Sequence, residues 1–319
     1  MNGSSYSETL ILTPYEDMGS AKNVFFIVVF LIYLASIIAN VSMMFLIYFD
    51  TSLHKPMYIF LFSLLVNGLI GSVAVWPKVM VILLTGDNTI SIAGCLIQTF
   101  LVITYGACNF TILTVMAYDR FLSIFNPLQY HTIMTPQKVR QLLFAASFTP
   151  AVLILSHICL TSQIPLCKHN IQRIFCDNLS FHALSCFETI QGLVSNLYGI
   201  CLFVGFGVVP LFLVFLSYYK IIVLSLKASG NARKKAFETC TPHLIIFINF
   251  SFASFFSVIY IRFNPHSEHM FLSIFYNLFP PLLHPLVYGL KNRETRQSLS
   301  KIRRRVVFAL SECQTTSKF

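Results

Sequence analysis

Two adjacent side chains of opposite charge, Asp119 and Arg120, are the residues of this sequence best suited to do chemistry. They stand where a long apolar run ends, and Asn126-Pro127 breaks the chain shortly afterwards. A charge pair at the edge of a hydrocarbon layer loses hydration and usually marks a functional site. Such a pair can lock and unlock, because protonating the carboxyl group in a low-dielectric setting weakens the attraction. We therefore interpret it as a functional element, with a structural ion pair at the membrane edge as the alternative.

The sequence contains no other group of residues spaced for catalysis or metal binding. No cluster of metal ligands and no nucleophile–base spacing occurs, so we expect no enzyme, no metal site and no cofactor. His266 and His269 lie three residues apart, but a stable metal site usually needs three or four ligands. We interpret them as two solvated loop histidines.

The composition indicates a membrane protein. Of 319 residues, 56% are hydrophobic and only 11% are charged, whereas a soluble domain carries about 25% charged residues. A helix needs roughly 20 apolar residues to cross a bilayer, and seven stretches satisfy this requirement. They are Val24–Tyr48, Met57–Leu84, Ala93–Ile124, Gln141–Leu160, Leu193–Ile222, Phe237–Ile261 and Phe271–Leu290.

The fold class predicted from these runs is an all-α integral membrane protein, a bundle of seven transmembrane helices. The connections are too short to hold another domain. Residues 1–23 are expected to form an outer tail, residues 24–290 the helix bundle, and residues 291–319 an inner tail. The polar, acidic N-terminal residues do not resemble a cleavable signal peptide, so the first span is expected to act as the signal anchor.

Basic residues set the orientation. With the N-terminus outside, most of the 22 lysines and arginines fall in the inner segments, as the positive-inside rule requires. The C-terminus is then cytoplasmic. The net charge of +10 reflects this bias and contact with anionic membrane lipid, not affinity for nucleic acid.

Four cysteines fall on the outer side, where disulfides form and persist. Cys95 begins the third span, and Cys167, Cys176 and Cys186 lie between the fourth and fifth. Four cysteines allow three connectivities, and their spacing does not choose among them. Asn2 opens a glycosylation sequon, Asn2-Gly3-Ser4, on the same side.

Six short motifs at the span ends occur together in the order and spacing of a known family. Seven spans with Asp119-Arg120 at the inner end of the third resemble a rhodopsin-like G-protein-coupled receptor, and the motifs resemble its odorant receptor family. The motifs are Pro56–Leu61, Met116–Phe121, Asn126–Tyr130, Ser217-Tyr218, Lys235–Leu244 and Pro280–Tyr288. The resemblance covers Asn40–Lys301. The tripeptides Asn67–Leu69 and Trp76–Lys78, together with Thr241–Leu244, look more similar to the fish-type branch.

The resemblance implies a function and a mechanism. An odorant receptor of the plasma membrane binds a small-molecule odorant within the helix bundle and activates a stimulatory-type heterotrimeric G protein, which raises cAMP. It also implies disulfides between Cys95 and Cys176 and between Cys167 and Cys186. The residues that the resemblance assigns to activation and G-protein coupling are Asp119, Arg120, Tyr218, His243 and Tyr288.

This chain departs from the family pattern at three positions. His284 stands before the proline of the seventh span, where the family usually has Asn. Gly68 stands where many members carry Asp, so a carboxylate-dependent sodium site is not expected there. Phe121 replaces the more usual Tyr.

The expected ligand site lies in the outer half of the bundle. Val102 and Ile103 occupy the face of span three where amine receptors carry Asp, so a charged amine would go unpaired. A helical arrangement predicts a mostly apolar inward stripe, which suits a small neutral or weakly polar molecule. Arg262 or Lys78 near the mouth would suit an acidic or hydroxylated compound. The predicted stripe is Val102, Ile103, Gly106, Leu202, Phe203, Phe206, Ser251, Phe255 and Asn277.

Other membrane classes fit less well. A transporter would need mid-membrane charges and an internal repeat, and a channel would need a pore-lining ring. Neither pattern is found in the sequence. The alternative that remains is a non-olfactory rhodopsin-like receptor for a lipid or metabolite.

Overall fold

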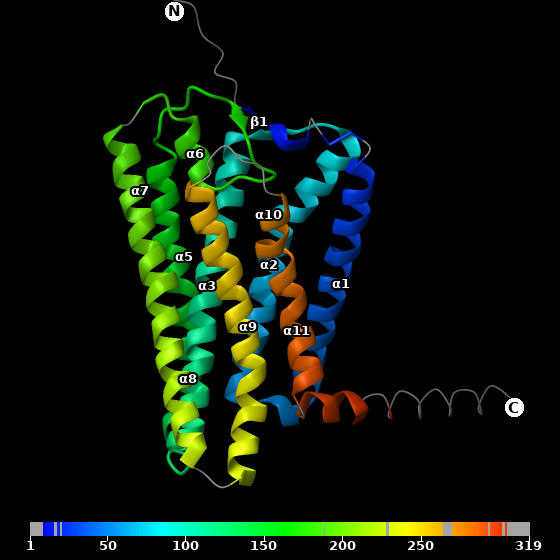
Figure 1. Ribbon diagram of the computed structural model, residues 1–319, viewed down its shortest axis with the longest axis vertical. Coiled ribbons are helices and arrows are strands. Elements are labelled where there is room, and N and C mark those ends of the chain that lie inside the picture. The colour runs from blue at the N-terminus through cyan, green and yellow to red at the C-terminus, as the bar shows by residue number, and fades with distance from the viewer. Residues whose placement is uncertain are drawn as a thin grey trace, which may run out of the picture.

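The structure is a computed structural model that describes residues 9–15, 18–19, 21–187, 189–227, 230–263, 270–292, 294–301 and 304. Figure 1 shows long helices side by side in one bundle, with short elements capping the outer end. Within the described residues, six helical stretches are long and apolar enough to cross a membrane. They are α1 (Ala21–Phe49), α2 (Pro56–Thr85), α3 (Ile92–Phe125), α5 (Pro136–Thr161), the continuous α7–α8 segment (Ile190–Lys227) and the part of α9 from Phe237 to Tyr260.

The seventh span is divided into two helices, α10 (Met270–Asn277) and α11 (Phe279–Lys291). Leu278 separates them, and Pro280 and Pro281 follow directly. Proline has no N–H and its ring clashes with the preceding turn, so two consecutive prolines favour a break in the helix here. Each half is therefore too short to count as a span by itself. The predicted all-helical membrane fold is confirmed, and the interrupted seventh span completes the bundle.

Local sequence explains where the helices start and stop. The Ser91 hydroxyl accepts a hydrogen bond from Gly94 N at the start of α3, and Thr135 does the same for Lys138 N at α5. Such capping satisfies backbone donors that have no partner inside the helix. At the end of α2, Gly86 adopts φ of 79°, a left-handed conformation that favours glycine.

Span five contains a local change of helix type. α7 (Ile190–Phe203) passes into a π-helical turn at Val204–Val208, and α8 (Val209–Lys227) continues it. The remaining short helical elements are α4 (Tyr130–Ile133), α6 (Asn178–Leu184) and 3₁₀ turns at Thr13–Tyr15 and Thr51–Leu53. Residues 294–301 are also helical and turn across the inner end of the bundle (Figure 1).

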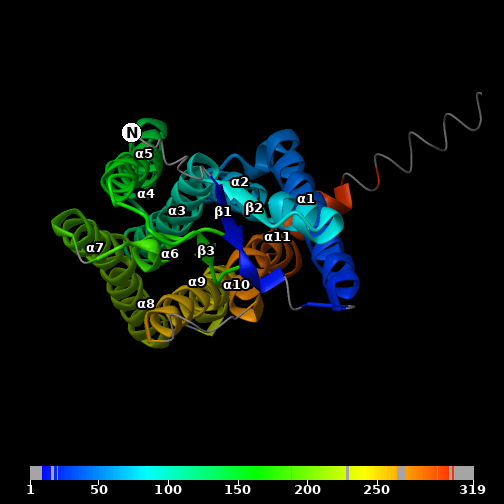
Figure 2. The ribbon, with the colours of Figure 1, turned by 90° about the horizontal axis from the view of Figure 1, so that it is seen from above.

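A small sheet covers the outer end. β1 (Thr9–Leu12) lies between β2 (Thr89–Ser91), which it pairs antiparallel, and β3 (Asn170–Ile171), which it pairs parallel. Figure 2 shows β1 crossing the bundle when it is viewed from above. The Tyr15 hydroxyl donates to Ile174 O at 2.6 Å and fixes the segment further. The all-helical prediction did not include this sheet, because strands of two to four residues leave no periodic pattern.

The core consists of an inner and an outer cluster of apolar side chains and a small third one, formed by Ala107, Ile154 and Ile158. The inner cluster contains Phe110, Phe247 and Phe250, and the outer cluster contains Trp76 and Phe181. Many large apolar side chains on the outward-facing sides of the helices are instead exposed, as contact with lipid requires.

Candidate functional site

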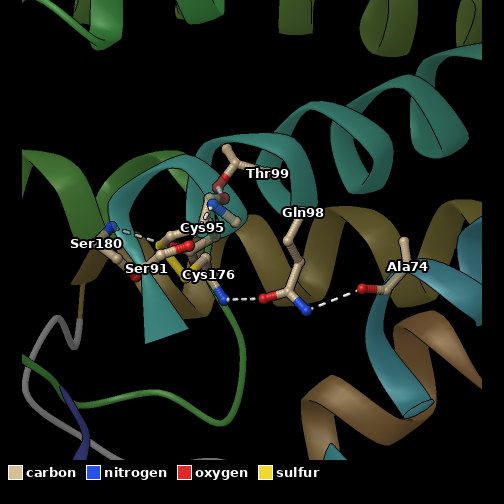
Figure 3. Close-up of a disulfide and its surroundings, with 9 residues drawn as sticks. Ala74, Ser91, Cys95, Gln98, Thr99, Cys176 and Ser180 are labelled. Carbon is tan, nitrogen blue, oxygen red and sulfur yellow. Dashed lines mark hydrogen bonds between the residues drawn. A yellow bond between two sulfur atoms is a disulfide. The ribbon is translucent and has the colours of Figure 1, made fainter. Parts of the chain in front are cut away.

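Two disulfides fasten the roof of the outer site, and Figure 3 shows the one between Cys95 and Cys176. Cys95 at the start of α3 is bonded to Cys176, and Cys167 is bonded to Cys186. Beside the first bond, Cys176 N donates to Gln98 Oε1 at 2.8 Å, and Gln98 Nε2 donates to Ala74 O at 2.8 Å. The loop after span four is therefore attached to both α2 and α3. Both pairings that the family resemblance implied are present.

A cavity of about 410 Å³ lies beneath this roof. Its walls come from α3, α5, α7 with the following π turn, α9 and Tyr276 of α10, and Asp177 with the start of α6 covers it from outside. Its size is in the range of small-molecule sites in proteins. Six of the nine residues predicted from the sequence line it: Val102, Ile103, Gly106, Leu202, Phe203 and Phe206.

Three predicted pocket residues, Ser251, Phe255 and Asn277, lie outside the cavity lining. The Phe255 ring packs edge-on against Phe203 and Phe110, at centroid distances of 5.1 Å and 5.8 Å. It therefore supports two residues of the cavity wall. For Phe255 the helical phase of α9 explains the difference, because its neighbour Ser254 and Val258 line the cavity instead.

Sequence reasoning missed the roof and much of the polar lining. Phe175, Asp177, Asn178 and Leu179 close the cavity from above. A signal for them existed, because the bond between Cys95 and Cys176 holds this loop over span three. The missed polar residues of the helices are His157, Asn196, Ser254, Ser257 and Tyr276.

The wall between α5 and α7 is joined by buried hydrogen bonds. His157 Nε2 lies 3.0 Å from Ser195 O, and Thr161 Oγ1 lies 2.9 Å from Ser195 Oγ. A carbonyl oxygen only accepts, so Nε2 must carry the proton and donate. A side chain at Gly199 would meet the His157 ring at 3.0 Å, so glycine permits this close approach.

The charged side chains near the cavity, Asp177 and Arg262, already interact with other residues of the protein. Asp177 pairs with Arg173 at 3.4 Å and accepts from Ser180 N at 2.7 Å. Arg262 Nη1 donates to Asn196 Oδ1 at 2.9 Å. In the roof, burial lowers the pKa of His182, with smaller contributions from His157 and Arg262. The cavity thus offers apolar surface and hydroxyl or amide groups, a combination that suits a neutral ligand.

At the inner end of α3, both oxygens of the Asp119 carboxylate are occupied. Arg120 donates to Oδ2 through Nε at 3.0 Å and Nη2 at 2.5 Å. The Tyr130 hydroxyl donates to Oδ1 at 2.6 Å. Burial, followed by the nearby Asp119 charge, raises the pKa of Tyr130, so the phenol stays protonated and keeps donating. Tyr130 was not among the predicted site residues.

A second buried junction joins α3, α8 and α9. His243 Nε2 lies 2.9 Å from Leu113 O and must donate to it, because the carbonyl only accepts. Nδ1 is then the acceptor for the Tyr218 hydroxyl at 2.5 Å. Among the described hydrogen bonds, Tyr218 is joined to His243, and none joins it to Arg120. Tyr288 is fully buried, and its hydroxyl has no hydrogen-bond partner among the described residues.

The helical residues 294–301 are attached to the turn between α1 and α2. Lys55 Nζ and the Tyr58 hydroxyl contact the Glu294 carboxylate at 2.5 Å and 3.0 Å. The Ser298 hydroxyl donates to Asp50. Hydrogen bonds from Ser298 and Ser52 lower the pKa of Asp50 to about 2, so this carboxylate is charged at cytoplasmic pH. Asn2, His266 and His269 lie outside the described residues.

Comparison with known proteins gives a consistent family match. The profile described as "Olfactory receptor" matches residues 29–305. The human protein Olfactory receptor 10J1 is 34% identical over 277 residues, covering 85% of this chain and 84% of that protein. Human Olfactory receptor 10J5 is 33% identical, covering 94% and 97%. Mouse Olfactory receptor 5T9 is 32% identical, covering 97% and 93%.

Proposed function

Because this chain belongs to the olfactory receptor family, we propose that it binds a small odorant in the outer cavity and activates a stimulatory-type heterotrimeric G protein, raising cAMP. It is a multi-pass receptor of the plasma membrane and not an enzyme. One observation carries the proposal: a single helix, α3, lines the cavity at Gly106 and holds the Asp119–Arg120 pair at its inner end. At 1.5 Å per residue, the two lie roughly 20 Å apart along the helix.

The proposed ligand is small and neutral or weakly polar. The lining is mostly apolar, and the carboxylate of Asp177 is already paired. A ligand amine would find no free carboxylate among the described lining residues, so its charge would be desolvated without compensation. An acidic or hydroxylated odorant can be accommodated if Arg262 breaks its hydrogen bond to Asn196 and donates to the ligand instead.

Substituting Val102→Asp is expected to raise the EC50 of neutral agonists at least about tenfold, because a buried unpaired carboxylate is strongly unfavourable. Val102 is 5% exposed and forms part of the cavity wall. The measurement is a cAMP dose–response curve at matched surface expression. The control is Val102→Thr, which keeps the side-chain shape without charge. An unchanged EC50 for Val102→Asp, or activation of the native receptor by amines alone, would contradict the ligand assignment.

We propose that Asp119 holds Arg120 in the resting state. In the active state, Arg120 would turn into the space that opens when α9 moves away from α3. The bonds of His243 to Leu113 and Tyr218 support this view, because they fix α9 against α3 and α8 in the structure described here. Arg120 and Asp119 are the proposed switch, with Tyr218, His243 and Tyr288 as the surrounding partners.

Substituting Tyr130→Phe is expected to raise basal cAMP. A hydrogen bond to a charged group contributes about 1.5–3 kcal/mol, so its loss is expected to shift the resting equilibrium by about tenfold to a hundredfold. Basal reporter activity per receptor at the surface is the measurement. Tyr118→Phe is the matched control, because Tyr118 is exposed and adjacent to the same pair. Equal basal activity in both variants would argue against a role for the Tyr130 hydroxyl.

The proposed function itself is tested by expressing the native chain with a cAMP reporter and a broad odorant panel. The expected result is a saturable cAMP response to one or more neutral odorants. If agonists raised a different second messenger, the G-protein assignment would fall and the receptor assignment would stand. We also propose the fish-type branch, on Asn67–Leu69 and Trp76–Lys78, which a phylogenetic tree of fish and mammalian receptors tests.

A further inference from the structure

The cavity extends to the lipid-facing surface of two helices. On α7 and the first residue of the π-helical turn, the side chains of Leu193, Leu197, Ile200 and Val204 follow a helical repeat and are 42–59% exposed. This stripe faces the bilayer, because apolar side chains so exposed need a hydrocarbon environment. Ile200 belongs to the stripe and also lines the cavity. The cavity wall and the lipid face therefore meet at this residue.

The same pattern occurs on α9. Phe252, Phe256, Ile259 and Phe263 follow a helical repeat and are 44–80% exposed. Ile259 and Phe263 of this stripe line the cavity as well. Two facing helices thus each present a residue that touches both lipid and cavity. This is the arrangement expected where the seam between two spans is also the edge of an internal site.

The seam between α7 and α9 is joined more weakly than the other side of α7. Toward α5, buried hydrogen bonds of His157 and Thr161 to Ser195 hold α7, and Tyr198 adds a bond to Ser156 at 2.9 Å. Toward α9, the described contacts that frame the cavity edge are few. The bond from Arg262 to Asn196 lies above it, and the Phe203–Phe255 ring contact lies below it.

On the aqueous side, the cavity is covered in part by chain that is fastened to the helices. The disulfide to Cys95 and the bonds of Gln98 fix the loop at Cys176 over the helices. Phe175, 7% exposed, forms part of this roof. A path from water directly above Phe175 and Asp177 is therefore blocked by covalently fastened chain.

We propose that ligands enter the cavity from the outer leaflet, through a portal between α7 and α9 framed by Ile200 and Ile259. The ligand class is an apolar molecule that partitions into hydrocarbon and carries at most a weakly polar group. Arg262 borders the portal on its outer side, because it lines the cavity and joins α9 to α7 through its bond to Asn196. A long arginine side chain of this kind can keep its charged end in lipid headgroups or water if that bond breaks. The inference rests on the proposed function only in taking the cavity as the ligand site.

The test uses two photoactivatable diazirine probes on the full chain in cell membranes. One is an uncharged aryl diazirine that dissolves in the bilayer, and the other is a sulfonated analogue confined to the outer water. Labelling is measured by mass spectrometry on Gly106–Phe110, a buried stretch of α3 in which Gly106, Ala107 and Phe110 line the cavity. The uncharged probe is expected to label this stretch, and the sulfonated probe is expected to label it at least tenfold less.

The decisive variant carries Ile200→Trp and Ile259→Trp, which fill the portal from both sides. It is expected to lower labelling of Gly106–Phe110 at least fivefold. The matched control carries Leu197→Trp and Phe256→Trp, on the same exposed stripes but outside the cavity lining, and should label as the native chain does. Surface expression and labelling of the exposed Phe252 show whether a variant is folded. If the double tryptophan variant fails to fold, the same measurement is made on each single tryptophan variant.

Three results would overturn the portal: absence of label on Gly106–Phe110 in the native chain, equal labelling by the sulfonated probe, or unchanged labelling in the folded portal variant. The assay needs neither an odorant nor a G protein. If the cAMP assay failed while the labelling behaved as expected, the portal would stand and the proposed signalling would fall. If the cAMP assay gave the expected response and the labelling did not, the portal would be refuted and the proposed signalling would stand.

Discussion

Replacing Arg120 with alanine is expected to abolish agonist-induced cAMP, with the maximal response falling at least about tenfold. The guanidinium makes two hydrogen bonds to Asp119 in the resting structure and is the proposed contact for the G protein in the active one. Alanine removes both functions and leaves Asp119 buried with Tyr130 as its remaining described hydrogen-bond donor. A dose–response curve normalised to receptor at the surface measures the effect.

Two variants sharpen this experiment. Arg140→Ala removes an exposed arginine at the inner start of α5 and is expected to signal normally, which controls for the loss of inner-face charge. Arg120→Lys keeps the charge but loses the planar, multiply donating group, so a weak response is expected. Retained signalling by Arg120→Ala at normal surface level would refute the proposed mechanism.

The second large effect is expected from Cys95→Ser, which should nearly eliminate receptor at the cell surface. The bond from Cys95 to Cys176 closes a sequence separation of 81 residues. In the chain-entropy view, such a cross-link contributes about 4–5 kcal/mol, which is a large share of the stability of an ordinary domain. Losing it also frees the loop that forms the cavity roof. Flow cytometry of surface against total receptor measures the result.

The other cysteines provide the controls. Cys201→Ser alters a free, exposed cysteine of α7 and is expected to be neutral. Cys167→Ser opens a separation of only 19 residues, for which the same relation gives about 3 kcal/mol, so a smaller loss is expected. The double change of Cys95 and Cys176 to serine removes the risk of mispairing by a leftover thiol. Normal surface delivery of that double variant would show that the bond is dispensable.

The spans could be predicted from sequence because their cause is local. Bilayer thickness sets a length of apolar chain, and each of the seven predicted runs overlaps a helix or helix pair of the structure. The inward stripe on α3 followed from helix periodicity, so Val102, Ile103 and Gly106 were placed at the cavity. The disulfide pairing depended on the family resemblance, because spacing left three choices.

The missed features depend on contacts between distant parts of the chain. β1 exists because Thr9–Leu12 meets strands some 80 and 160 residues away, and no local pattern encodes that meeting. Asn178 and Leu179 line the cavity because a disulfide positions their loop, not because of their own types. On α9, a phase error of one residue was enough to favour Phe255 over Ser254.

The π-helical turn at Val204–Val208 has a consequence for how relatives are aligned. An α-helix advances about 100° per residue, so the extra residue of a π turn rotates everything after it by that amount relative to an uninterrupted helix. Leu202 and Phe203 lie before or at this shift, and Tyr218 lies after it. A relative lacking the turn would match this chain residue by residue on only one side of Val204. Position-by-position transfer of pocket residues and of inner-face residues along span five therefore needs two separate registers.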